Sequence, residues 1–383
     1  MNILMISDVY FPRINGVSTS IQTFKSEFEK QGHHVSLIAP TYEGSSQEKN
    51  IFRIPSRNIP YDPEDKMMSY KAITRLLPDL EKLHFDLIHI HTPFVAHYAG
   101  VNLSKALKIP CIATYHTLFE EYLYHYVPIV PKQIMRFFTR KFSSSQNDQV
   151  QGVIAPSSVI VNLLKEYGVH NNITIIPTGI ESKRFEKGDG NRFITKHNIP
   201  TDKKILLNVS RVAYEKNMGV LIEMLHEVKK AIPEIFLIIA GEGPAKKSYM
   251  DQASKLNLDD NIAFVGYLDR DTELIDCYYC ADIFVFSSKT ETQGLVLLEA
   301  MACGIPVVSV AEMGTKDVLN NCKAAKITTG EVSDFSEKVI SLLGSKSEYD
   351  SLKSEAKEYA REWDSAAIAK KMLEFYKEII NSN

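Results

Sequence analysis

Short hydrophobic runs alternate with longer, helix-like stretches along the first half of the chain. The first run, residues 2–7, has no alternation of apolar and polar positions, which is typical of a parallel strand buried on both faces. A loop follows and leads into a helix predicted near residues 18–31. Further strands are predicted at 34–39, 86–91, 111–116, 152–157 and 173–179, and further helices near 67–83, between 91 and 111, and near 131–147.

The second half of the chain starts the same pattern again. Its strands are predicted at 204–210, 235–241, 262–266, 283–288, 306–310 and 324–328, with helices between most of them and at the end. Strands that alternate with helices predict an α/β protein with two doubly wound, Rossmann-like parallel sheets. The polar segment 177–191 is the predicted junction, so the expected domains are 1–178 and 179–363, and we expect a cleft at the carboxyl ends of the strands.

Composition restricts the class of protein. Hydrophobic residues make up 44% of the 383 positions and charged residues 24%, as in ordinary globular proteins. The net charge of −3 argues against general nucleic-acid binding. Five dispersed cysteines favour reduced thiols and a cytoplasmic location. The N-terminus lacks the pattern of a signal peptide, and no window of 18 apolar residues predicts a membrane-spanning helix.

The first candidate site lies in "KTETQGLVLLEAMACG", after the strand predicted at 283–288. Gly294 marks a predicted helix start, whose backbone N–H groups and partial positive charge suit a phosphate. Glu291 precedes this helix and Glu299 lies on it, and an ionised carboxylate suits paired hydroxyls of a sugar or ribose. The arrangement fits a nucleotide-sugar. The alternative is that Glu291 interacts with the helix dipole and Glu299 lies on a solvated face.

A second cluster lies at the end of the strand predicted at 204–210. Arg211 and Lys216 provide two cations that suit a diphosphate, unless they are ordinary surface charges. Gly241 lies in a tight strand-to-helix turn, and Tyr267 and Leu268 follow the next predicted strand. All five residues are candidates for binding the donor. The segment "GEGPA" is not a complete G-x-G-x-x-G, so the dinucleotide-binding fingerprint is absent.

Histidines mark the strand ends of the first half. His116 lies at the very end of the run 111–116, just past the predicted strand, and its alternative role is a structural hydrogen bond. His89 and His91 share one face of a strand, which raises the possibility of a metal site, but no third ligand has a suitable spacing. We therefore favour a structural or acceptor-side role for this pair. The D-x-D at 269–271 precedes a helix, so we interpret Asp271 as its N-cap and predict no catalytic metal and no cofactor.

Together these motifs resemble the retaining glycosyltransferases of the GT-B fold, in the large family four that includes sucrose synthase. The resemblance covers essentially the whole chain. It includes the glutamates Glu291 and Glu299, the basic pair Arg211 and Lys216, and the glycine of the first loop, Gly16. A further family segment is present as "PTGIESKRF", with Thr178 and Glu181 in place of the commoner Asn and Asp.

The resemblance implies roles for these residues. Glu291 would contact the donor sugar, Glu299 the ribose hydroxyls, and the backbone of Gln293, Gly294 and Leu295 the diphosphate. His116 would lie near the anomeric carbon, and Gln293 replaces the usual aromatic residue. The final helix, 364–383, would pack back on the first domain. The resemblance also implies that the leaving phosphate oxygen accepts the proton of the acceptor, so that configuration is retained.

The acceptor side is predicted from residues 114–142, which are aromatic and then basic. On a helix that begins near 131, the residues Lys132, Arg136 and Arg140 form one stripe, with Lys141 beside it. Such a helix can lie on an anionic bilayer, although it can equally be an ordinary domain helix. The stretch 114–128, together with 176–180 and 290–304, looks most like the diacylglycerol glucosyltransferases within the family. The expected activity is therefore transfer of a hexose, such as glucose from UDP-glucose, to a lipid at the inner face of the cytoplasmic membrane.

Other functions remain open at this level. One is a transferase, such as a mannosyltransferase that uses GDP-mannose, with a soluble or glycan acceptor. From other classes, the chain could be a nucleotide-dependent oxidoreductase or a sugar-nucleotide sensor without catalysis. The absent G-x-G-x-x-G argues against the oxidoreductase, and the set of His116, Arg211, Lys216, Glu291 and Glu299 argues against the sensor.

Overall fold

The computed structural model describes residues 1–45, 48–59, 62–116 and 132–382. The chain divides into two compact units. The first contains residues 1–179 and 365–383, and the second contains residues 180–364. Each unit is built around its own parallel sheet, and the two are described separately. The prediction of two Rossmann-like parallel sheets is thereby confirmed.

Within the described residues, the sheet of the first unit has seven parallel strands in the order β3-β2-β1-β6-β7-β8-β9. Their bounds are β1 (Asn2–Ile6), β2 (His34–Pro40), β3 (Ile51–Ile54), β6 (Leu87–Ile90), β7 (Cys111–Thr114), β8 (Gly152–Ala155) and β9 (Ile173–Ile175). The helices that the structure describes in this unit are α1 (Gly16–Lys30), α2 (Tyr70–Thr74), α3 (Leu77–Glu81), α4 (Val95–Leu107), α6 (Lys132–Asn147), α7 (Ser158–Glu166) and α16 (Ser365–Asn381).

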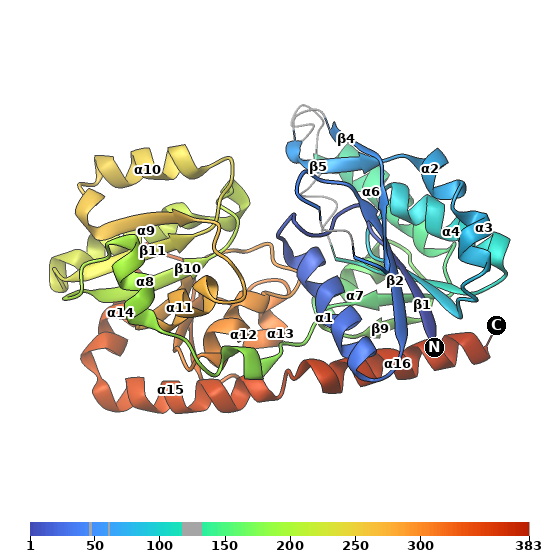
Figure 1. Ribbon diagram of the computed structural model, residues 1–383. Helices are drawn as coiled ribbons and strands as arrows, with labels where there is room; N and C mark the ends of the chain where they lie inside the picture. The colour runs from blue at the N-terminus through green and yellow to red at the C-terminus, as the bar shows by residue number, and fades with distance from the viewer. Residues whose placement is uncertain (46–47, 60–61, 117–131, 383) are drawn as a thin grey trace. The chain divides into compact units, whose positions relative to one another are not determined.

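Two glycines let helices pack closely on this sheet. A Cβ atom added at Gly100 of α4 would lie 2.7 Å from a side-chain carbon of Ile90 on β6. A Cβ atom added at Gly152 of β8 would lie 2.7 Å from the ring of Phe375 on α16. The last helix of the chain therefore covers the sheet of the first unit, where it also packs on α1 (Figure 1).

Some elements of the first unit differ from the sequence prediction. The stretch predicted as a helix near 67–83 contains two short helices, α2 and α3, and its first residues belong to β5. We did not predict β3, nor the antiparallel hairpin of β4 (Ser56–Ile59) and β5 (Asp62–Met68). We also missed α7. The segment 48–68 is rich in polar and charged residues and has short hydrophobic runs, so its periodicity gave little signal.

The sheet of the second unit has six parallel strands in the order β12-β11-β10-β13-β14-β15. Their bounds are β10 (Lys204–Val209), β11 (Ile235–Ala240), β12 (Ile262–Gly266), β13 (Ile283–Phe286), β14 (Val307–Val310) and β15 (Ala325–Thr328). The α-helices are α8 (Gly190–His197), α9 (Met218–Ala231), α10 (Lys246–Lys255), α11 (Glu273–Tyr279), α12 (Leu295–Ala302), α13 (Thr315–Leu319), α14 (Val332–Gly344) and α15 (Lys346–Arg361). Three short 3-10 helices are η1 (Ser182–Phe185), η2 (Tyr214–Lys216) and η3 (Asp259–Asn261).

Both faces of this second sheet are buried. Leu206 of β10 packs into one core with α9, α10 and α14. Its neighbours Ile205 and Leu207 point into the opposite core, which contains α8, α11, α12 and α15. Figure 1 shows these helices around the sheet. Because successive strand residues point to opposite faces, two buried faces require hydrophobic residues at every position, which explains the continuous apolar runs in the sequence.

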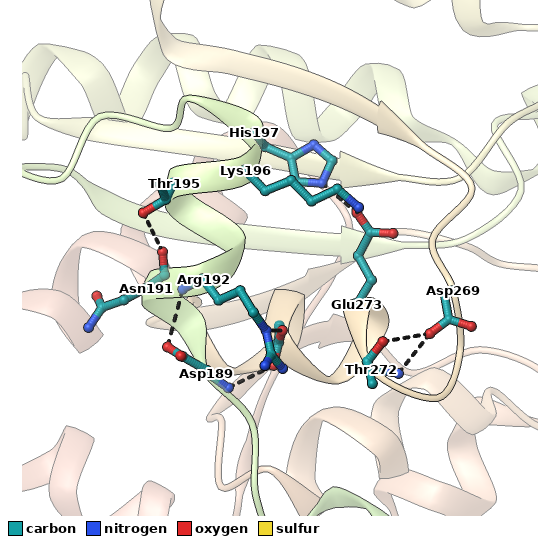
Figure 2. Close-up of polar contacts among 10 residues, drawn as sticks. Asp189, Asn191, Arg192, Thr195, Lys196, His197, Asp269, Thr272 and Glu273 are labelled. Atoms are coloured by element: carbon teal, nitrogen blue, oxygen red, sulfur yellow. Dashed lines mark hydrogen bonds and ion pairs between the residues drawn. The ribbon is translucent and has the colours of Figure 1, made fainter.

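Polar contacts fasten α8 to α11 in the second unit (Figure 2). The Asp276 carboxylate accepts hydrogen bonds from the backbone N–H of Asp189 at 2.7 Å and from Arg192 Nε at 2.5 Å. One turn earlier on α11, Glu273 pairs with Lys196 at 2.6 Å and with His197 at 2.8 Å. The start of the second unit is thus held to the helix that precedes β13.

Candidate donor site and histidine cluster

The basic and acidic residues predicted for the donor site meet in the second unit. Lys216 ends η2, which follows β10, and Glu291 lies in the loop after β13. Lys216 Nζ donates a hydrogen bond to Glu291 Oε1 at 2.6 Å, and each side chain is 18% exposed. Strands β10 and β13 are neighbours in the sheet, so two residues that are 75 positions apart in sequence form one ion pair at its carboxyl edge. This pair can therefore offer a ligand both a cation and a carboxylate that accepts hydrogen bonds from hydroxyl groups.

The predicted helix start lies beside this ion pair. Gly294 has φ of 90° and is the N-cap of α12, which begins at Leu295. A Cβ atom at Gly294 would lie 2.9 Å from a side-chain carbon of Thr315, and this left-handed conformation favours glycine. Gln293, directly before it, is buried. The first turn of α12 therefore follows a glycine that no larger residue could replace without strain.

Gly241 lies at the end of β11, in close contact with the loop after β10. Its backbone N–H donates to the carbonyl of Gly266 at 2.8 Å, and its φ is 141°. A Cβ atom there would lie 2.0 Å from the carbonyl oxygen of Ser210, the residue before Arg211. Gly241 thus allows two strand-end loops to approach each other, and one of these loops contains Arg211 and Lys216.

Glu299 has partners that the sequence did not reveal. Its side chain is buried on α12 and accepts hydrogen bonds from Arg270 Nη2 and from Tyr278 OH, both at 2.8 Å. Burial raises the pKa of Tyr278 well above its usual value, and the Glu299 charge raises it further, so this hydroxyl keeps its proton. Glu299 holds Arg270 in place as well as being a candidate ligand for ribose. Arg270 was visible in the sequence only as the middle of the D-x-D.

The D-x-D itself has a structural role, but one prediction about it is wrong. Asp269, not Asp271, caps the turn that begins α11, since its Oδ2 accepts from the N–H of Thr272 at 2.9 Å and from its hydroxyl at 2.8 Å (Figure 2). Asp271 instead pairs with Arg184 at 2.7 Å. Asp269 lies three residues before the helix N-cap, Thr272, and its side chain reaches the N–H of that residue, whereas Asp271 is directly next to Thr272 in the chain. Nearby, Leu268 is buried and Tyr267 is 46% exposed.

The described residues contain no group of three His, Cys, Asp or Glu side chains that could hold a metal ion. Within the same described ranges, no helix has the length and apolar character to cross a membrane.

In the first unit, the predicted residues lie at the carboxyl ends of β1 and β7. Gly16 is the first residue of α1, whose N-cap Asn15 accepts a hydrogen bond from the N–H of Ser18 at 2.8 Å. His116 lies two residues beyond β7, and its Nε2 is 3.2 Å from Nδ1 of His91. Burial lowers the pKa of His116 to about 4. This histidine is therefore neutral near pH 7.

His89 and His91 have structural partners in the first unit. His89 Nδ1 is 2.6 Å from Tyr376 OH on α16, and its Nε2 is 2.6 Å from Thr114 Oγ1 on β7. Burial lowers the pKa of both histidines well below the usual value. A cavity next to this cluster is lined by His97, His116, Gln146 and Asn147, among others.

The residues predicted to bind a membrane lie on α6. Arg140 and Lys141 are exposed near its middle. The side chains of Lys132 and Arg136 lie outside the described residues, as does the aromatic segment 117–131. The structure therefore includes α6 as a helix over Lys132–Asn147, close to the predicted 131–147, while its basic stripe stays a prediction.

Comparisons with known proteins agree with these features. Residues 14–184 match the family model "Glycosyltransferase Family 4", and residues 189–363 match "Glycosyl transferases group 1". The chain is 34% identical over 320 residues to an alpha-monoglucosyldiacylglycerol synthase from Streptococcus pneumoniae, covering 81% of this chain and 71% of that protein. It is 27% identical over 329 residues to a GDP-mannose-dependent alpha-mannosyltransferase from Corynebacterium glutamicum, covering 84% and 75% of the two chains.

The fold has close structural relatives. A sucrose-phosphate synthase from Thermosynechococcus elongatus superposes with a TM-score of 0.81 at 20% sequence identity, covering all of both chains. This similarity shows the GT-B fold, as the resemblance in sequence led us to expect. On the family models and the pneumococcal relative together, the chain belongs to the family-four glycosyltransferases and is a glycosyltransferase of the GT-B fold.

Proposed function

We propose that the protein transfers glucose from UDP-glucose to diacylglycerol, with retention of configuration, as a peripheral protein at the cytoplasmic face of a membrane. The proposal for the donor rests on the Lys216–Glu291 pair at 2.6 Å, which lies beside Gly294, the N-cap of α12. A cation and a helix start suit a diphosphate, and a carboxylate suits the hydroxyls of a hexose. The relative from S. pneumoniae supports diacylglycerol as the acceptor.

In the proposed reaction, the hydroxyl oxygen of the acceptor forms a bond to the anomeric carbon of glucose. The bond from this carbon to the phosphate oxygen breaks, and its electron pair leaves with UDP. The departing phosphate oxygen takes the proton of the acceptor hydroxyl. Lys216, Arg211 and the N–H groups at the start of α12 stabilise the charge that develops on the phosphate, so the reaction needs no metal or other cofactor.

In this proposal the first unit binds the acceptor near His116, and the second binds the nucleotide through Tyr267, Leu268 and Glu299. We expect Glu291 to contact the sugar. Gly16 would let the backbone of the first loop approach the donor. Arg140 and Lys141 are exposed on α6 and, with Lys132 and Arg136, would contact anionic lipid. Each basic residue near an anionic surface contributes about 1 kcal/mol, so four of them support reversible binding.

The donor and acceptor are tested together with radiolabelled UDP-glucose and GDP-mannose, presented with vesicles that contain diacylglycerol. We expect label from UDP-glucose in the lipid fraction. Label from GDP-mannose alone would favour the second candidate, a mannosyltransferase, which the similarity to the C. glutamicum enzyme supports. Label that stays out of the lipid fraction but enters a glycan acceptor would exclude diacylglycerol.

The membrane contact is tested by vesicle flotation. The double variant Arg136→Glu with Arg140→Glu should leave anionic vesicles and lose transfer to lipid, while hydrolysis of the donor without acceptor stays unchanged. A matched control, Lys370→Glu with Lys371→Glu, makes the same change of charge at exposed positions of α16 and should still float. If the wild-type protein fails to float with anionic lipid at low salt, the proposed lipid surface is wrong.

A further inference from the structure

Three histidines form a continuous stack in the first unit. The ring centroids of His89 and His91 are 3.9 Å apart, and those of His91 and His116 are 5.5 Å apart with nearly parallel planes. His89 and His91 are fully buried, and His116 lies at the end of the stack beside the cavity lined by His97 and Asn147. The stack therefore leads from the interior of the unit to the histidine that we place in the proposed reaction.

The hydrogen bonds in this stack are unequal. Both ring nitrogens of His89 have partners, Tyr376 and Thr114. His91 has one, because its Nδ1 is 3.2 Å from His116 Nε2 while its own Nε2 is buried with no hydrogen-bond partner among the described residues. The contact with His116 is thus the one hydrogen bond that the structure gives to the His91 ring within those residues.

All three rings are neutral near pH 7, because burial lowers the pKa of each of them. A neutral imidazole carries one proton, on Nδ1 or on Nε2, and its hydrogen bonds decide which. In the hydrogen bond between His91 and His116, only one of the two facing nitrogens carries the proton, so two arrangements are possible. Either His91 donates from Nδ1, or His116 donates from Nε2.

The buried nitrogen of His91 distinguishes the two arrangements. If His116 donated, His91 would carry its proton on Nε2, and a buried N–H would lack an acceptor. If His91 donates from Nδ1, its Nε2 is an unpaired acceptor instead. Among backbone groups, orphaned buried N–H groups are rarer than under-satisfied carbonyls, and by the same reasoning we favour donation by His91.

We propose that His91 is a positioning residue that donates its Nδ1–H to His116 Nε2 and thereby holds His116 in the Nδ1–H tautomer. His116 then offers an N–H to a substrate oxygen, and its single basic nitrogen is occupied. It acts as a hydrogen-bond donor and not as a general base toward the acceptor hydroxyl. The consequence for catalysis rests on the proposed function, whereas the tautomer is a property of the protein alone.

The tautomer is measured in the full-length protein labelled with ¹⁵N-histidine, from long-range ¹H–¹⁵N correlations at pH 7. The chain has 11 histidines, and the His116 signals are assigned as those missing from a His116→Asn variant. We expect the pattern of an Nδ1–H imidazole for His116. The pattern of an Nε2–H imidazole would overturn the proposal.

Two variants of His91 separate positioning from packing. The side-chain amide of Asn places a donor close to the position of histidine Nδ1, so His91→Asn should keep the His116 tautomer. His91→Leu fills the space without a donor and should lose it, with kcat roughly tenfold lower and KM for the donor unchanged, as for one lost hydrogen bond. His84→Asn, at an exposed position, is the control for substitution alone. If His91→Leu keeps both the tautomer and the rate, His91 only packs.

If His91→Leu does not fold, the wild-type spectrum and the Asn variant still decide the tautomer. The proposed function can fail separately. A His116→Asn variant that transfers sugar at the wild-type rate would remove His116 from the reaction but leave the tautomer result unchanged. The two proposals therefore have different readouts.

Discussion

Each unit carries its predicted site residues at the carboxyl ends of a parallel sheet, but the chemistry of these residues differs between the two. In the first unit they are neutral, buried imidazoles in contact with one another. In the second they are charged side chains in ion pairs: Lys216 with Glu291, and Glu299 with Arg270, a partner that we did not predict. A charged diphosphate needs the second kind of edge, and uncharged hydroxyls suit the first. One sheet topology thus supports two kinds of site, because the strand-end loops supply the chemistry.

The largest effect is expected at the charged edge, that is, the carboxyl edge of the second unit's sheet where Lys216 and Glu291 lie. Lys216→Ala should lower kcat roughly a hundredfold, because a cation that stabilises the leaving phosphate is lost. Steady-state kinetics with UDP-glucose measure this. Lys230→Ala removes a lysine from an exposed pair with Glu227 on α9 and should leave kcat unchanged. A Lys216→Ala enzyme with the wild-type kcat would mean that the charged edge does not bind the donor phosphates.

Glu299→Ala should weaken donor binding by about 1.5–3 kcal/mol for each charge-assisted hydrogen bond lost to ribose. It should also lower thermal stability, because Arg270 loses its buried partner. Tyr278→Phe is the matched variant, since it removes one hydrogen bond to Glu299 and keeps the carboxylate. Tyr278→Phe should lower thermal stability, while the affinity for the donor, measured by titration calorimetry, should change little. If Glu299→Ala binds the donor with unchanged affinity, Glu299 does not contact the ribose and only holds Arg270 in place.

The first unit, with its neutral, buried histidines, should be the first to lose stability in acid. In the folded protein burial lowers the pKa of His89, His91, His97 and His116 below the usual 6.5. Below pH 6.5 the unfolded chain therefore binds more protons at these histidines than the folded protein does. Their contribution to the free energy of unfolding is present above pH 6.5 and is lost as pH falls toward 4. For His97, which is 2% exposed with a pKa of about 4, this loss is about 3 kcal/mol. Burial raises the pKa of Asp8 to about 6. Protonation of this carboxyl group therefore favours the folded state as pH falls, and this gain offsets the loss of stability from one histidine.

Hydrogen exchange between pH 7 and pH 4 follows the two units separately. Peptides of the first unit should lose protection at a higher pH than those of the second. His97→Leu should make the stability of the first unit less dependent on pH. If the second unit opens first, or if His97→Leu leaves the dependence unchanged, the buried neutral histidines do not control acid unfolding.

The smallest effect is expected from metal removal. Treatment with EDTA should leave transferase activity substantially unchanged, because Arg211, Lys216 and the start of α12 take the place of a metal ion in the proposed mechanism. Activity before and after chelation is the measurement. Complete loss that manganese or magnesium restores would contradict this expectation, and Asp269→Ala and Asp271→Ala variants would then identify the ligands.

Sequence patterns predicted the strands of both sheets well where the runs were apolar and continuous. Residues such as 204–210 and 235–241 are hydrophobic on both faces, which only a covered parallel strand requires, and they became β10 and β11. The hairpin at 56–68 was missed because short polar strands have no such signal. The capping aspartate was misplaced because two aspartates lie within one turn of the helix start, and only the loop geometry selects Asp269.

The sequence by itself determined the fold class, the family, and the strand ends that carry chemistry, because these depend on local periodicity and on motifs at fixed spacing. The tertiary structure decided which side chains meet. Lys216 contacts Glu291 only because β10 and β13 are adjacent, and Glu299 contacts Arg270 only because α12 packs beside the loop after β12. The contact of His91 with His116 likewise requires β6 beside β7. Contacts between residues distant in sequence depend on sheet order and packing, which no local pattern encodes.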